Sequence, residues 1–417
     1  MMKHRHALVI AGDDELTALA IAEGLVDVGA SVILGCGKPE RAQKAAERRG
    51  IARKEEAGSD WSPGCEVRAL ELGSPAGVYA FAETMLDDDR PLHVIVNCAD
   101  DVSPFYQRES SVVSGGGWET TAGRNHLGPF LLTQLMLDKV VATMKSDAKT
   151  SRSAARLAER RSSARLTTRT SDRSSTATQD FIEENNANQQ EVIARPYPAP
   201  LGRVVSLGLH ARIGRQRSRK RAEDPPAVKG LFVGASNYSE WGTYRTAHEA
   251  NTLSSLHLSK MLRAVPAPHT GEIVEVNVVR PAFGRWLPRP VRRMLRVSQA
   301  PALTATFLAS TPMKGLNGLF FSDFAAEPAW QKSAAMPGRG QRQAYAAKQL
   351  FAASMSMTGS PAASWRSEGA MVVRGAMARE RRRKAEVRQR LEEEQSKRRR
   401  GLREMEVPEE VVEAKSK

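Results

Sequence analysis

Cysteine is scarce in this 417-residue chain, which contains only Cys36, Cys65 and Cys98. Three cysteines cannot build a disulfide framework, and their spacing fits no metal-binding motif, so we expect buried, reduced thiols and no metal site. No run of about 18 apolar residues occurs, so no membrane-spanning helix is expected. The first apolar run starts at residue 7. We therefore expect no signal or transit peptide, and an intracellular, cytoplasmic location.

Acidic residues are outnumbered by basic ones, 47 against 62, which gives a net charge of +15. Residues 203–221 contain seven basic side chains and no acid, and residues 371–417 contain fifteen basic and ten acidic side chains. Such segments attract nucleic acid or acidic proteins, act as nuclear-import signals, or form solvated tails. Few aromatic residues accompany them, so base stacking is not indicated.

Short apolar runs alternate with amphipathic helical segments over residues 1–145 and again over residues 196–352. This alternation predicts βαβ units and an α/β fold, a doubly wound parallel sheet of Rossmann type in a single domain. Residues 146–195 are rich in Ser, Thr, Arg and Asn, and they predict a disordered insertion. Residues 353–417 predict a low-complexity linker and a basic helical tail.

Three segments resemble the short-chain dehydrogenase/reductase superfamily, in its retinol dehydrogenase and WW-domain oxidoreductase branch. "GWETTAGRNHLGPFLLTQLML" (117–137) resembles its central helix, "VIVNCAD" (94–100) its Asn-Asn-Ala-Gly strand end, and "NYSEWGTYRTAHEANTLSSLHLSKML" (237–262) its active-site helix. The likeness covers roughly residues 5–145 and 200–352. It implies an NAD(P)-dependent oxidoreductase that acts on an alcohol or carbonyl, and a homodimer formed through the long helices.

The resemblance implies roles for four catalytic positions. Asn125 matches the asparagine that holds a water molecule, and Tyr244 matches the general acid/base. Ser206 is either the serine that polarises the substrate or its neighbour, with Leu207 in the active position. His248 stands where the family has a lysine whose charge favours the phenolate. Because an imidazole titrates near ~6.5, it supplies little charge at neutral pH. We therefore predict slow or absent turnover.

The resemblance places NADP or NAD on a loop with three glycines, of which only Gly12 remains; Leu16 and Ala18 occupy the other two positions. Residues 13–15 add three carboxylates where the pyrophosphate would lie. The loop is therefore either a weakened phosphate site or an ordinary capped turn.

The resemblance implies five other cofactor positions. Lys38 lies next to Gly37, which stands where the family often has an arginine, and Glu71 replaces an aspartate. The remaining positions are Asn97, Ala99 and Pro281.

Two functions follow from these residues. The first is an NAD(P)-dependent oxidoreductase with a divergent, weakly binding site. The second is an inactive dehydrogenase fold that serves as a binding or scaffold protein, with basic segments that contact RNA, a ribonucleoprotein or an acidic protein.

Overall fold

A computed structural model of the chain divides it into two units, Met1–Ala362 and Ala363–Lys417. All described residues belong to the first unit. They are residues 2–12, 16–53, 62–101, 118–169, 202–209, 240–263, 274–281, 300–311, 317–322, 324–327 and 339–359.

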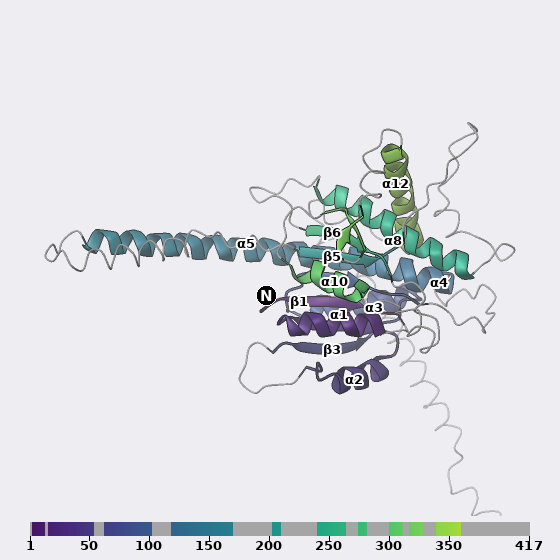
Figure 1. Cartoon of the computed structure of the whole chain (residues 1–417), viewed down its shortest axis with the longest axis horizontal. Helices are drawn as coiled ribbons and strands as arrows, with labels where there is room; N and C mark the ends of the chain where they lie inside the picture. Colours follow the sequence, from purple (N-terminus) through teal and green to yellow (C-terminus); the bar gives the residue numbers. More distant parts are fainter. Residues whose placement is uncertain are drawn as a thin grey trace, which may run out of the picture. The chain divides into compact units, whose positions relative to one another are not determined.

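The described residues form one eight-stranded sheet of the order β3-β2-β1-β4-β5-β6-β7-β8 (Figure 1). The strands are β1 (His6–Ile10), β2 (Ser31–Cys36), β3 (Gly64–Ala69), β4 (Val94–Asn97), β5 (Gly202–Leu207), β6 (Val274–Val279), β7 (Phe320–Ser322) and β8 (Ala325–Ala326). Neighbouring strands pair in parallel except β7 and β8. The predicted doubly wound parallel α/β sheet is confirmed.

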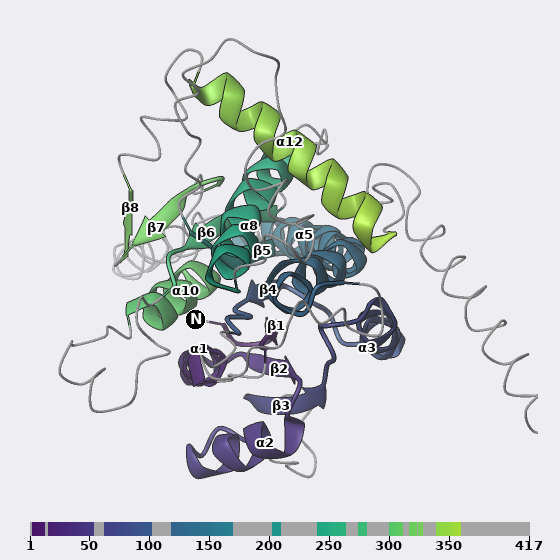
Figure 2. The ribbon, with the colours of Figure 1, turned by 90° about the vertical axis from the view of Figure 1, so that its right-hand side faces the viewer.

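Helices cover both faces of this sheet. They are α1 (Leu16–Asp27), α2 (Pro39–Arg48), α3 (Pro75–Asp87), α4 (Thr120–Ala122), the π-helical turn η1 (Gly123–Leu127), α5 (Gly128–Arg169), α8 (Glu240–Arg263), α10 (Ala300–Ser310) and α12 (Arg339–Thr358). Helices α1 and α10 pack together on one face, and α3, α5 and α8 lie on the other (Figure 2). Helix α12 packs along α8 and also contacts α5.

Because helices cover both faces of the sheet, its strands are apolar. Every residue of β1 is buried, because a parallel sheet between two helical layers exposes neither face. The strand order reverses between β1 and β4, which are neighbours although β2 and β3 separate them in sequence. In such sheets the crevice beyond the carboxyl ends of these two strands is the usual ligand site. A ligand site is therefore expected beyond the carboxyl ends of β1 and β4.

Two helices differ from the sequence prediction. Helix α5 runs to Arg169, so residues 146–169, expected to begin a disordered insertion, are helical. These residues are rich in Ala and Arg, which are strong helix formers, and they extend an existing helix without a new nucleation cost. Residues 170–195 lie outside the described residues.

Helix α12 was not predicted. It crosses the expected domain boundary at residue 352 and ends at Thr358. Its buried Leu350 and Phe351 fix it against α8 and α5. The basic tail at 371–417 and residues 210–221 lie outside the described residues.

Candidate functional site

Tyr244 lies beside the carboxyl end of β4, where it meets an aspartate. Its hydroxyl donates a hydrogen bond of 2.6 Å to Oδ1 of Asp100. His248 lies one turn further along α8, with its ring centroid 4.5 Å from that of Tyr244 and its Nε2 3.3 Å from Asp100 Oδ1. All three side chains are buried. Asp100, Tyr244 and His248 therefore form one enclosed cluster, which we call the Tyr–Asp–His cluster.

His248 occupies its position without a directed side-chain hydrogen bond. Its contact with Asp100 is not aligned as a hydrogen bond, and neither ring nitrogen has a hydrogen-bond partner among the described residues. Its backbone carbonyl instead accepts from the N–H of Leu209 at 3.0 Å and from Thr252 Oγ1 at 3.3 Å. The residue thus holds α8 against the end of β5, and its ring fills the space beside Asp100.

Asn125 lies in the η1 turn, a π-type distortion of the kind often found at functional sites. Its Oδ1 accepts from the backbone N–H of Asp101 at 2.7 Å. Its Nδ2 donates to the backbone oxygens of Asp101 at 2.9 Å and Thr121 at 3.0 Å. The side chain is fully buried. Asn125 therefore holds the backbone of Asp101, just after β4, at both its N–H and its C=O.

Gly12 is at the carboxyl end of β1, and the carboxylate of Asp101 is packed against it. A Cβ atom at Gly12 would overlap that carboxylate. The pyrophosphate of a dinucleotide would approach this turn, and a carboxylate there repels it. Residues 13–15, the predicted source of three more carboxylates, lie outside the described residues. Among the described residues of this turn, Gly12 lies against the Asp101 carboxylate.

The other predicted cofactor positions make contacts within the protein. Lys38 directly precedes α2 and is exposed. Glu71 Oε1 accepts from the N–H of Gly73 at 2.8 Å, which closes its own turn. Ala99 and Pro281 are buried next to β4 and β6.

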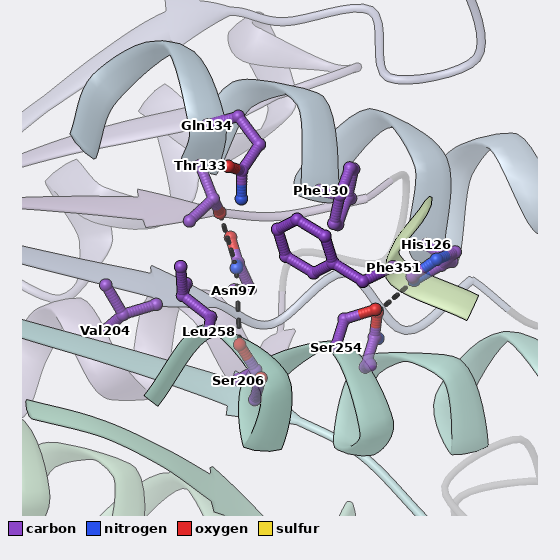
Figure 3. Close-up of a pocket in the computed structure, with 12 residues that line it drawn as sticks. Asn97, His126, Phe130, Thr133, Gln134, Val204, Ser206, Ser254, Leu258 and Phe351 are labelled. Atoms are coloured by element: carbon purple, nitrogen blue, oxygen red, sulfur yellow. Dashed lines mark hydrogen bonds between the residues drawn. The ribbon is translucent and has the colours of Figure 1, made fainter. Parts of the chain in front are cut away.

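Asn97 and Ser206 meet in a small pocket on the side of the sheet that faces α5 and α8 (Figure 3). Asn97 Nδ2 donates to Thr133 Oγ1 at 2.9 Å and to Ser206 Oγ at 3.3 Å. The cavity has a volume of about 20 Å³. That is room for about one water molecule, and too little for a substrate. The structure pairs Ser206 with Asn97 and does not place it in hydrogen-bond contact with Tyr244.

A polar network that was not predicted from the sequence connects to Asn125. His126 bonds to Asn251 Oδ1 and to Ser354 Oγ, each at 2.8 Å. Burial lowers the pKa of His126 to about 4. Asn251 Nδ2 donates to the backbone oxygens of Asn125 at 2.9 Å and Leu207 at 3.1 Å. The network ties η1, α8, α12 and β5 together; polar residues inside otherwise apolar helices were the only sequence signal for it.

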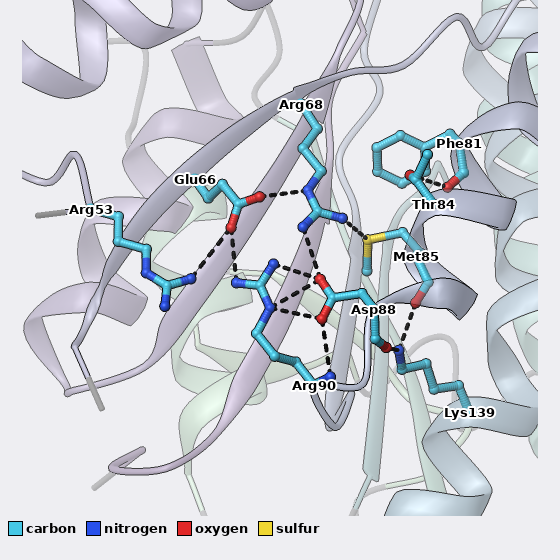
Figure 4. Close-up of polar contacts among 9 residues, drawn as sticks. All are labelled: Arg53, Glu66, Arg68, Phe81, Thr84, Met85, Asp88, Arg90 and Lys139. Carbon is cyan, nitrogen blue, oxygen red and sulfur yellow. Dashed lines mark hydrogen bonds and ion pairs between the residues drawn. The ribbon is translucent and has the colours of Figure 1, made fainter. Parts of the chain in front are cut away.

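A network of ion pairs lies at the β3 edge of the sheet (Figure 4). Asp88 accepts from Arg68 at 2.8 Å and from Arg90 at 2.6 Å, and Glu66 accepts from the same two arginines. Burial alone would raise the pKa of Asp88, but the arginine hydrogen bonds lower it well below its usual range. Lys139 donates to the backbone oxygens of Met85 and Asp88. This network joins edge strand β3 to α3 and α5.

In the part of the chain that the structure describes, no three His, Cys, Asp or Glu side chains are placed to hold a metal ion. Within the same ranges, no helix combines the length and apolar character needed to cross a bilayer. The three cysteines are free and buried, and burial raises the pKa of Cys65 to about 12.

Comparisons with known proteins show local sequence similarity and a shared fold. No protein-family model matches the sequence. Human retinol dehydrogenase 14 is 35% identical over 144 residues, which are 33% of this chain and 41% of that protein. Chloroplastic protochlorophyllide reductase from Daucus carota is 32% identical over 133 residues, 32% of this chain and 31% of that protein. An uncharacterised protein from Mycobacterium paratuberculosis shares the fold, with a TM-score of 0.50, 19% identity, and coverage of 86% of this chain and 94% of that one. The chain therefore spans less than half the length of these curated relatives.

Proposed function

Because this chain belongs to the short-chain dehydrogenase/reductase superfamily, in its retinol dehydrogenase-like branch, we propose that it keeps the dehydrogenase fold as a binding protein and transfers hydride slowly or not at all. The observation that carries this proposal is the hydrogen bond from Tyr244 to the buried carboxylate of Asp100.

The acid/base chemistry of such a tyrosine requires a phenolate, or a proton ready to move to the substrate oxygen. Asp100 already accepts the Tyr244 hydrogen bond at 2.6 Å, and its negative charge repels a second negative charge on the phenol oxygen. His248 takes the place of the lysine cation that would offset this repulsion. The cluster therefore favours a neutral, internally bonded tyrosine.

Cofactor capture is weakened by the second aspartate. Asp101 is packed against Gly12, the one glycine retained from the phosphate loop. A dinucleotide would have to displace a carboxylate whose backbone is held at both N–H and C=O by Asn125. We infer that NADP and NAD bind weakly or not at all.

The test combines a binding and a turnover measurement. Thermal unfolding is followed with NADP or NAD at millimolar concentration; a ligand at 100 times its Kd would stabilise the fold by about 2.7 kcal/mol. Hydride transfer is followed with a panel of retinoid, steroid and aliphatic carbonyls. We expect no thermal shift and no turnover above that of Tyr244→Phe. A cofactor-dependent shift together with turnover that Tyr244→Phe abolishes would refute the proposal.

Variants separate charge from shape at the same site. Asp101→Asn keeps a side chain of the same size beside Gly12 and removes its charge, whereas Asp101→Gly removes both. We expect Asp101→Gly combined with His248→Lys to gain cofactor binding, and Asp101→Asn alone to gain less. No gain of cofactor binding in any of these variants would show that the Asp101 carboxylate is not what weakens cofactor capture.

A divergent oxidoreductase that acts on an alcohol or carbonyl is the second candidate. It is supported by the hydrogen bonds of Tyr244 with Asp100 and of Asn125 with Asp101, two adjacent residues just after β4. The same two assays decide between the candidates.

A further inference from the structure

We propose that the small pocket between β4 and α8 is an internal water site, in which one bound water molecule bridges Oδ1 of Asn97 and Oγ of Ser254. Both oxygen atoms are buried, both residues line the pocket, and neither atom has a hydrogen-bond partner among the described residues. Tyr244 does not line this pocket, so the water site holds whether or not the chain transfers hydride.

The amide of Asn97 is oriented so that its oxygen needs a donor. Its Nδ2 donates to Thr133 Oγ1 at 2.9 Å and to Ser206 Oγ at 3.3 Å. Thr133 gives its own hydroxyl proton to the backbone oxygen of Pro129 at 2.8 Å. The reversed amide would therefore set two oxygen atoms against each other, with no proton between them. Oδ1 is thus an acceptor in a side chain that is only 8% exposed.

The hydroxyl of Ser254 differs from its neighbours on α8. Thr252 and Ser259 bond back to backbone oxygens of their own helix, those of His248 at 3.3 Å and of Leu256 at 2.9 Å. A hydroxyl inside a helix is often satisfied in this way. Within the part of the chain that the structure describes, Ser254 makes no such bond, although it is only 6% exposed. Its hydroxyl is therefore available to a ligand in the pocket.

Size, charge and polarity make water the ligand that fits this pocket. Its volume of about 20 Å³ holds about one water molecule. Among the described residues, no Asp, Glu, Lys or Arg lines it, so it lacks the charge that would bind a cation or an anion. Leu258 and Phe351 form apolar walls, and polar side chains converge on the pocket from the sheet, α5 and α8 (Figure 3). A wholly apolar cavity stays dry, but the two unpaired oxygens give a water molecule the partners that it needs.

Such a water joins the sheet to the helices that cover it. Asn97 ends β4, Ser254 lies on α8, and Phe351 reaches the pocket from α12. Without a bridge, two buried oxygens would lose their hydrogen bonds to solvent on folding, which costs more than ordering one water molecule. The water also completes the hydrogen bonds of Asn97, which in turn holds Ser206 within the protein's own network.

Water ¹⁷O magnetic relaxation dispersion of the full chain tests the site, because its amplitude is proportional to the number of long-lived internal water molecules. Ser254→Val removes the hydroxyl and adds a methyl group to the pocket. The control is Ser259→Ala, which removes a buried hydroxyl of the same helix whose partner is the backbone of Leu256. We expect the amplitude to fall by one water molecule in Ser254→Val and to stay unchanged in the control.

A double-mutant cycle tests the bridge with alanine variants alone, and so applies whether or not Ser254→Val folds. Asn97 and Ser254 share no direct hydrogen bond, so a bridging water is what would couple Asn97→Ala to Ser254→Ala. In urea titrations, we expect the unfolding equilibrium constant of this double variant to be at least about fivefold lower than additivity requires. Asn97→Ala combined with Ser259→Ala should agree with additivity to within about twofold.

An unchanged relaxation amplitude in Ser254→Val would overturn the water site, and so would a fall in amplitude that Ser259→Ala shares. Equal coupling of Asn97 to Ser254 and to Ser259 would refute the bridge, even with a water molecule in the pocket. Turnover and cofactor binding are measured in separate assays at Tyr244, so failure of the water site leaves the proposed function standing, and the reverse also holds.

Discussion

Acid should destabilise the fold through His126, because this histidine is enclosed in its neutral form. It is fully buried and bonded to Asn251 and Ser354, which tie α8 and α12 to the η1 turn. Burial lowers its pKa from 6.5 to about 4. A depressed pKa means that the unfolded chain binds the proton first. The stabilisation is therefore complete above pH 6.5 and is lost as the pH falls through about 4.

The size of the effect follows from the two pKa values. The full difference between 6.5 and about 4 corresponds to about 3.4 kcal/mol. At pH 5 the unfolded histidine is almost fully protonated and the folded one is not, so about 2 kcal/mol is lost relative to pH 8. Burial also lowers the pKa values of His6, to about 4, and His93, to about 3, and both contribute in the same direction.

Urea unfolding at pH 8 and pH 5 tests this reasoning with His126→Gln. The variant loses packing and hydrogen bonds at both pH values, so it should be less stable than the unmodified chain at pH 8. It has no proton to bind, so its loss of stability between pH 8 and pH 5 should be smaller by about 2 kcal/mol. Parallel pH dependences in the two proteins would show that His126 does not titrate differently in the folded and unfolded chain.

Four further outcomes follow from the packing. Asp88→Ala removes one of the two carboxylates that Arg68 and Arg90 share, and should lower the free energy of unfolding by about 1–2 kcal/mol in urea titrations. Cys65 should resist iodoacetamide at pH 8 until urea is added, because burial raises its pKa to about 12. Phe351→Ala removes a ring packed between Phe130 and His257 and should cost about 3 kcal/mol in the same titrations. Since α12 covers α8 and contacts α5, light scattering should give a monomer in place of the homodimer suggested by the resemblance.

The fold could be read from the sequence because its strands are short, apolar and separated by helices with clear ends. Ser74 illustrates this, since it caps α3 by accepting from the N–H of Gly77 at 3.1 Å, directly before Pro75. Helix α12 gave no comparable signal. Its alanines, glutamines and serines form a helix without a strong apolar stripe, and its partners on α8 lie about 100 residues earlier in the chain. A contact at that distance cannot be read from local pattern.

Residues of the candidate site could be predicted from the sequence, but the contacts between them could not. Tyr244, His248 and Asn125 were found by resemblance, and the structure brings them to one edge of the sheet. Ser206 belongs elsewhere, because alternation along β5 turns its side chain toward Asn97. The sequence showed Asp100 only as an extra acid; its bond to Tyr244 depends on the relative placement of β4 and α8, which sequence spacing does not determine.

That bond also changes what a mutation of the tyrosine should do. A tyrosine retained only for catalysis can become phenylalanine with little effect on stability, since only an oxygen is lost. Here Tyr244→Phe leaves the buried Asp100 without its hydroxyl donor, which should cost about 2 kcal/mol in urea titrations. Asp100→Ala in turn removes the acceptor of the Tyr244 hydroxyl, whereas the double variant removes both groups of the pair together. Its cost should therefore be smaller than the sum of the single costs by about 1–2 kcal/mol. Tyr345→Phe makes the same change at a side chain that is 53% exposed and should be neutral. Additive costs at Tyr244 and Asp100 would mean that the pair does not stabilise the fold, and the account of a tyrosine held by its own protein would fail with it.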